Sequence, residues 1–123
     1  MSHAIAIAVK TEYIEPQSVP DQNRYVFAYT VTITNRSDVR CQLVSRHWLV
    51  RDELNHVQEV RGSGVVGQQP SLAPGESYTY SSGVIIATRT GSMSGSYQMI
   101  DDEGLSFDAP IPEFALVPPH LLN

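Results

Sequence analysis

The strongest constraint on the fold is a strict alternation of side-chain type between residues 25 and 35. Large apolar side chains occupy every odd position from Tyr25 to Ile33, and threonine occupies positions 30, 32 and 34. Successive residues of a β-strand point to opposite faces, so a period of two places the whole apolar set on one face. The segment therefore predicts a strand with one face on a hydrophobic core.

The rest of the chain repeats this pattern in shorter pieces. Alternating segments occur near residues 5–9, 41–51, 78–86, 93–99 and 105–117, and turn signals such as Pro74-Gly75 separate them. No segment carries apolar residues at helical spacing over three turns. A chain of 123 residues suits one domain. We therefore expect a single all-β domain over residues 1–123, a β-sandwich of about seven to eight strands.

Composition excludes several classes of function. The net charge is −5, and no basic stripe offers the phosphate contacts that nucleic-acid binding requires. The apolar start is far shorter than the roughly 20 residues of a membrane-spanning helix. Cys41 is the only cysteine, so no intrachain disulfide can form. These features predict a cytoplasmic protein that binds neither nucleic acid nor membrane.

A glycine-rich stretch from Arg61 to Pro70 has the spacing GxGxxG. In a dinucleotide-binding fold this spacing opens a helix, but the two prolines and the glycine within residues 70–75 exclude a helix here. Three interpretations stay open, one of which is a loop that binds a partner. Backbone N–H groups at Gly62, Gly64 and Gly67 could form an anion-binding nest with Arg61 at its edge. Alternatively, the glycines allow positive φ or close strand approach.

Arg46 and Trp48 form a second candidate site, because the alternation of residues 41–51 assigns both to one face. It assigns Leu43 and His47 to the other face. An arginine beside a tryptophan could offer a cation–π platform to a protein partner. Trp48 could instead pack between two sheets, with the stem of Arg46 extended over it.

Catalytic and metal-binding patterns are missing. The histidines lack the spacing of a zinc site, and the serines around Met93 do not form a nucleophile motif. We predict no catalytic residue, no metal site and no cofactor, except Mg²⁺ accompanying a bound polyphosphate.

Several segments, in order, resemble the ApaG family. The shared motifs are Gln42–Trp48 (QLVSRHW), Val60–Pro70 (VRGSGVVGQQP), Leu72–Gly75 (LAPG), Met93–Tyr97 (MSGSY) and Ile111–Phe114 (IPEF). The resemblance implies a fibronectin type III/immunoglobulin-like β-sandwich without established enzymatic activity. It also implies a link to cobalt and magnesium homeostasis and a suggested pyrophosphate site at Gly62, Gly64 and Gly67.

These observations support two functional hypotheses. The first is a non-enzymatic module that binds a protein partner of unknown identity, with Arg46 and Trp48 as candidate contacts. The second is binding of pyrophosphate or a nucleotide polyphosphate by Arg61 and the glycine-rich loop. A homodimer formed through an exposed edge strand is a further expectation.

Overall fold

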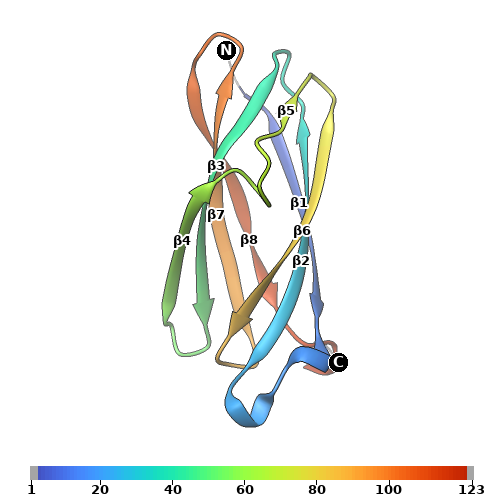
Figure 1. The fold of residues 1–123 in the computed structure, drawn as a ribbon, viewed down its shortest axis with the longest axis vertical. Helices are drawn as coiled ribbons and strands as arrows, with labels where there is room; N and C mark the ends of the chain where they lie inside the picture. Colours follow the sequence, from blue (N-terminus) through green and yellow to red (C-terminus); the bar gives the residue numbers. More distant parts are fainter. Residues whose placement is uncertain (1–2, 122–123) are drawn as a thin grey trace.

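The computed structural model describes residues 3–121 as an antiparallel β-sandwich (Figure 1). One sheet has the order β1-β2-β6, with bounds Ile5–Tyr13, Tyr25–Asn35 and Ser77–Ile86. The other has the order β4-β3-β7-β8, with bounds Val57–Ser63, Cys41–Asp52, Gly91–Asp101 and Ser106–Leu116. A short β5 (Ser71–Leu72) pairs with β3. The predicted β-sandwich of seven to eight strands is confirmed.

Short 3₁₀ turns complete the described chain. η1 (Glu15–Gln17) and η2 (Pro20–Gln22) connect β1 to β2, and η3 (Pro119–Leu121) follows β8. Within residues 3–121, no helix has the length and apolar character needed to cross a bilayer.

The core lies between the two sheets and is filled mainly by inward-facing aromatic and β-branched side chains. The alternating set of β2 supplies Phe27, Val31 and Ile33, which are all completely buried. Trp48 from β3 and Tyr97 from β7 face them from the opposite sheet, with their rings edge to face. The period-two pattern of residues 25–35 thus predicted the inner face of β2 correctly.

A β-bulge in β3 corrects the predicted face assignment of residues 41–51. The pairing of β3 with β7 shifts register between Leu43 and Ser45, so Val44 is the extra residue. The bulge reverses the phase of the alternation. Leu43, which precedes it, and Trp48, which follows it, are therefore both buried. Alternation alone assigned Leu43 and Trp48 to opposite faces, because it assumes an uninterrupted strand.

The two sheets leave four edge strands. On one side of the sandwich β1 packs beside β8. On the other side lie β4 and β6, with hollows between them. Pro110 and Pro112 are accommodated in β8 because it is an edge strand, where a missing N–H costs no ladder hydrogen bond on the free side.

Candidate functional site

The glycine-rich stretch ends β4 and then forms a tight hairpin. The Val65 N–H donates to the Gln68 carbonyl at 2.8 Å, and the Gln68 N–H donates back at 2.9 Å. The two residues between them, Val66 and Gly67, have φ values of 48° and 77°. Positive φ at both central residues is the requirement of a type I′ hairpin turn. Val65 itself is completely buried and packs into the core, while Val66 is exposed at the turn.

Arg46 connects this hairpin to β3 through two hydrogen bonds. Its Nη1 donates to the carbonyl oxygens of Ser63 and Gly64, both at 2.9 Å. A Cβ at Gly62 would lie within 2.8 Å of the same guanidinium group, so Gly62 leaves the space that Arg46 fills. Arg46 therefore has a structural contact with the glycine-rich stretch, which sequence reasoning did not foresee because residues 46 and 62 meet only through strand pairing.

Trp48 is a core residue and offers no surface to a partner. Only 2% of it is exposed, and its ring packs edge-on against Tyr29, Tyr97 and Phe114. Its indole N–H has no hydrogen-bond partner within the described chain. Of the two predicted partner contacts, only Arg46 reaches partly exposed surface.

Several backbone N–H groups of the predicted anion nest at Gly62, Gly64 and Gly67 are already used in pairing within the chain. The Gly64 N–H donates to the Val44 carbonyl at 2.8 Å, and the N–H groups of Val65 and Gln68 close the hairpin. The Gly62 N–H faces β3, because the even-numbered residues of β4 make the hydrogen bonds of that strand pair. Anion binding stays a prediction, without support from this geometry.

Arg61 lies on the outer face of the sheet and contacts a carboxylate. Its Nη2 is 3.2 Å from Glu59 Oε2, which also lies 2.6 Å from Nε2 of His47. The hydrogen bond from His47, followed by the charge of Arg61, lowers the pKa of Glu59. The positive charge of Arg61, which was expected at the edge of the glycine-rich loop, is therefore partly neutralised by Glu59 of the same strand.

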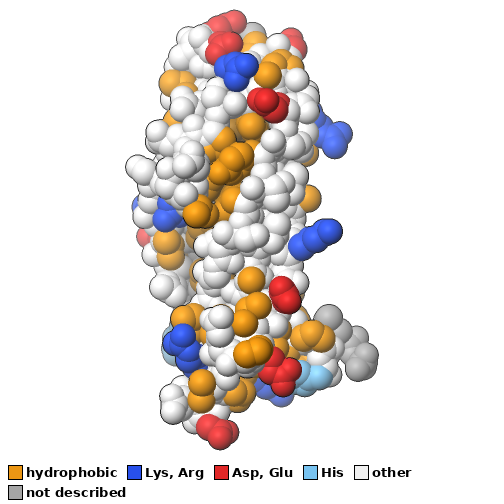
Figure 2. Space-filling view, turned by 45° about the vertical axis from the view of Figure 1, so that its right-hand side comes forward, with side chains coloured by type: hydrophobic (Ala, Val, Ile, Leu, Met, Phe, Trp, Pro, Cys, Tyr) orange, Lys and Arg blue, Asp and Glu red, His pale blue; other side chains and the backbone are white. Residues whose placement is uncertain are grey.

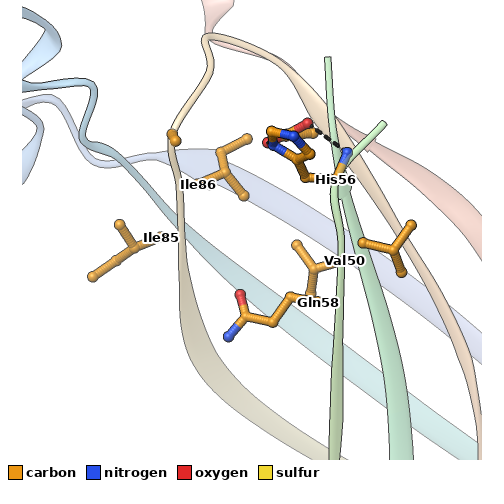
Figure 3. Close-up of a pocket in the computed structure, with 8 residues that line it drawn as sticks. Val50, His56, Gln58, Ile85 and Ile86 are labelled. Carbon is orange, nitrogen blue, oxygen red and sulfur yellow. Dashed lines mark hydrogen bonds and ion pairs between the residues drawn. The ribbon is translucent and has the colours of Figure 1, made fainter. Parts of the chain in front are cut away.

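The side between β4 and β6 contains a partly apolar candidate surface. Two adjoining hollows of about 250 and 460 Å³ share Val50, Gln58 and Ile85 in their linings. Figure 3 shows Ile85 and Ile86 of β6 across the first hollow from Val50 and Gln58. On one face of the molecule, hydrophobic side chains gather in narrow bands between polar surfaces (Figure 2).

Sequence reasoning missed these hollows. A signal was present in residues 84–86, where Val, Ile and Ile follow one another and break the alternation of β6. Val84 and Ile86 point inward, whereas Ile85 is left 48% exposed at the edge of the sheet. Three consecutive apolar residues leave one of them outside a two-faced strand.

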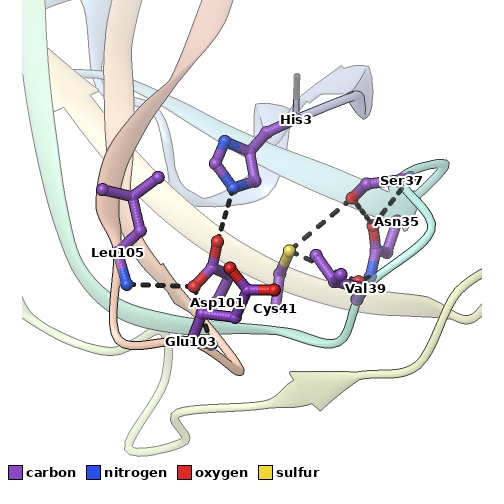
Figure 4. Close-up of polar contacts among 8 residues, drawn as sticks. All are labelled: His3, Asn35, Ser37, Val39, Cys41, Asp101, Glu103 and Leu105. Carbon is purple, nitrogen blue, oxygen red and sulfur yellow. Dashed lines mark hydrogen bonds and ion pairs between the residues drawn. The ribbon is translucent and has the colours of Figure 1, made fainter. Parts of the chain in front are cut away.

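A polar cluster at one end of the sandwich is structural (Figure 4). Asp101 is almost fully buried, and its Oδ1 accepts the N–H groups of Glu103 and Leu105, both at 2.9 Å. Its Oδ2 lies 2.9 Å from Nε2 of His3. The hydrogen bond with His3 is the main cause of the lowered pKa of Asp101.

Comparison with known proteins identifies the family. A family model described as the ApaG domain matches residues 15–101. The chain belongs to the ApaG family. Curated relatives named Protein ApaG include one from Pseudomonas aeruginosa strain PAO1, 54% identical over 98% of this chain and 96% of the relative. One from Azotobacter vinelandii is 53% identical with the same coverage.

Solved structures agree with this assignment. A crystal structure from Bordetella pertussis, described as an ApaA protein, has 48% identity and a TM-score of 0.92 over 95% of both chains. A protein from Archaeoglobus fulgidus has 9% identity and a TM-score of 0.56 over 94% of this chain and 97% of that chain, which shows likeness of fold alone.

In this ApaG chain the glycine-rich motif has a clear structural role. Gly62 makes room for Arg46, and Gly64 has a φ of 58° with its Cβ position only 2.3 Å from the Gln68 carbonyl oxygen. Gly67 supplies the second positive φ of the hairpin turn. The motif thus fixes a hairpin that inserts Val65 into the core. Within the described residues, no group of three or more His, Cys, Asp or Glu side chains is placed to hold a metal ion.

Proposed function

We propose that this ApaG-family chain is a non-catalytic binding module that takes up an extended, apolar segment of a partner protein along β6. The observation that carries the proposal is a long unprotected edge strand beside the hollows between β4 and β6. Addition of a strand to a free sheet edge is a recurring mode of peptide recognition, in which main-chain hydrogen bonds give affinity and pockets select alternate side chains.

The strand register identifies the free backbone groups of β6. The Asn35 N–H donates to the Glu76 carbonyl at 2.9 Å, and β2 and β6 pair in one continuous antiparallel register. Because hydrogen-bonded pairs alternate along antiparallel strands, the even-numbered residues of β6 face β2. The odd-numbered residues direct their N–H and C=O groups to the open edge: Ser77, Thr79, Ser81, Gly83 and Ile85.

The other edges carry features that discourage strand addition, whereas β6 carries none. β8 contains two prolines, and β1 contains Lys10 and Glu12. β4 contains the charged pair Glu59 and Arg61, which disfavours an uncharged apolar segment, although not a strand with complementary charges. Charged residues and proline protect exposed edges against pairing with other chains. The ten residues of β6, from Ser77 to Ile86, include no charge and no proline.

The hollows define the chemistry of the partner segment. The larger hollow is lined mainly by aliphatic side chains, including Val26, Val60 and Val84, and charged groups appear only in the smaller hollow. An inserted side chain would therefore be aliphatic. We infer a partner segment with β-branched residues at alternate positions and little charge.

A matched pair of substitutions at Gly83 tests this proposal. Gly83→Pro removes one outward N–H, whereas Gly83→Ala keeps it; the Ala Cβ would lie at an ordinary 3.5 Å from the nearest atom. Peptides selected from a displayed library against the wild-type chain should bind Gly83→Ala normally and Gly83→Pro at least about tenfold more weakly, a loss of about 1.4 kcal/mol. Calorimetry measures the affinities.

Controls make the result specific to β6. Thr11→Pro places a proline at an outward position of β1 and should leave binding unchanged. Amide shifts of Thr79, Ser81 and Ile85 should respond to the peptide in NMR spectra. Equal affinity for both Gly83 variants, or shifts confined to another edge, would refute docking at β6.

The docking proposal accounts for cation homeostasis only through the partner, and polyphosphate binding is an alternative to it. The family link to cobalt and magnesium is proposed to act through the partner, in the cytoplasm, with no cofactor of the chain's own. No contact of Arg61, Gly62, Gly64 or Gly67 favours pyrophosphate. Calorimetry with pyrophosphate and Mg²⁺ tests that alternative, and heat that disappears in Arg61→Ala would restore it.

A further inference from the structure

The second open edge, β4, has a sequence that complements itself. We propose that two copies of the chain associate by antiparallel pairing of β4 with β4, with Glu59 of each chain opposite Arg61 of the other. This association is separate from the docking proposed at β6, and each can hold without the other.

Backbone geometry makes the odd-numbered residues of β4 available. The Asp52 N–H donates to the His56 carbonyl at 3.1 Å, and the Gly64 N–H donates to the Val44 carbonyl at 2.8 Å. Both contacts fit the register of β3 with β4, so the even-numbered residues of β4 face β3. The N–H and C=O groups of Val57, Glu59 and Arg61 therefore face the open edge. The Ser63 N–H does so too, while the Ser63 carbonyl already accepts a hydrogen bond from Arg46.

Symmetry and charge select one register. A two-fold axis at Val60 places residue 59 opposite 61, so free groups meet free groups in that pair. It also places residue 57 opposite 63, where the Ser63 carbonyl would accept from Val57 in addition to Arg46. Moving the axis to residue 59 would place Glu59 opposite its own copy, and moving it to residue 61 would do the same for Arg61. Like charges directly opposite one another destabilise a sheet, whereas opposite charges stabilise it.

The side chains are positioned for this contact. Glu59 and Arg61 share the outer face of the sheet, and their side chains are 51% and 69% exposed. Glu59 uses Oε2 for both its contacts, with His47 and Arg61, which leaves Oε1 for the second copy. Figure 1 shows β4 as the outermost strand of its sheet, with no other element beyond it.

The inner face of β4 also suits a second copy. It consists of Gln58, Val60 and Gly62, so no charge points inward along this strand. Inward-pointing charge is one of the devices that prevent edge pairing. At the two-fold axis each Val60 would approach its own copy beside the hollow that it lines.

Charge reversal tests the register. Glu59→Arg and Arg61→Glu each create like charges in both symmetric pairs, and we expect the dimer dissociation constant to rise about tenfold or more in either variant. The double variant Glu59→Arg/Arg61→Glu restores opposite charges in the same register and should recover the wild-type constant. Sedimentation equilibrium measures dissociation, and thermal unfolding confirms that each variant is folded.

A control on another edge completes the design. Lys10→Glu makes the same change in net charge as Arg61→Glu but lies on β1, so it should leave dimerisation unchanged. A wild-type chain that stays monomeric at the highest concentration studied would overturn the proposal. A dimer that the single reversals leave intact, or that the double reversal fails to restore, would overturn it equally.

Discussion

Val66 is the most strained residue of the glycine-rich hairpin. A β-branched side chain at a φ of 48° is an unusual conformation, and 63% of the residue is exposed, so little burial compensates for the strain. Asn-Gly is the preferred pair for this type of turn. We expect Val66→Asn to stabilise the fold by about 1 kcal/mol, measured by chemical denaturation with Trp48 fluorescence as the probe.

Val57→Asn provides the matched control for Val66. Val57 is also exposed but lies in β4, where valine is favourable and asparagine is not. The same substitution should therefore lower the free energy of unfolding there. If both variants change stability in the same direction, strain at Val66 is not the cause.

At the scale of the element, three glycines of the glycine-rich stretch are each required for a different physical reason. Gly64→Ala should be the most damaging, because its Cβ would overlap the backbone oxygen of Gln68. Gly62→Ala should cost about 2 kcal/mol, since it displaces Arg46 from two carbonyl groups. Gly67→Ala meets no atom and should cost about 1 kcal/mol, from its positive φ alone. Denaturant titration of all three variants checks this order.

A double-mutant cycle isolates the contact between Gly62 and Arg46. In an Arg46→Met background the guanidinium is already absent, so Gly62→Ala should cost much less than in the wild-type chain. Equal costs in both backgrounds would mean that the glycine is required for strand approach rather than for Arg46.

At the scale of the whole molecule, Asp101 connects the N-terminal segment to the turn between β7 and β8. Its folded-state pKa lies below the usual value of 3.8, so its carboxylate stabilises the fold above that pH. This stability is lost as the pH falls through the lowered pKa. Unfolding measured from pH 7 to pH 2 should therefore show a steep acid loss that Asp101→Asn reduces. Asp102→Asn, at an exposed neighbouring position, should keep the wild-type profile.

The whole molecule also determines which backbone groups remain free. Two strands of similar local character, β2 and β6, differ in exposure because β2 lies between two neighbours and β6 has only one. The docking and dimer proposals both depend on this arrangement. It follows from long-range pairing, such as that between Phe27 and Val84, and not from the residues of either strand alone.

The sequence by itself determined the strands and their inner faces wherever the alternation was unbroken. The pattern from Tyr25 to Ile33 predicted a buried face correctly, because side-chain direction in a strand is a local property with a period of two. It also excluded a dinucleotide site at the glycine-rich stretch. Proline restricts the backbone of its own residue and of the residue before it, so this effect can be read from the local sequence.

Only the tertiary structure decided the roles of the candidate site residues. The bulge at Val44 reversed the face of β3, the pairing of β3 with β4 brought Arg46 to the glycine hairpin, and Glu59 engaged Arg61 on the outer face. Each depends on which strands pair and in which register. A single sequence does not contain that information locally, because the partners of a strand are residues far along the chain.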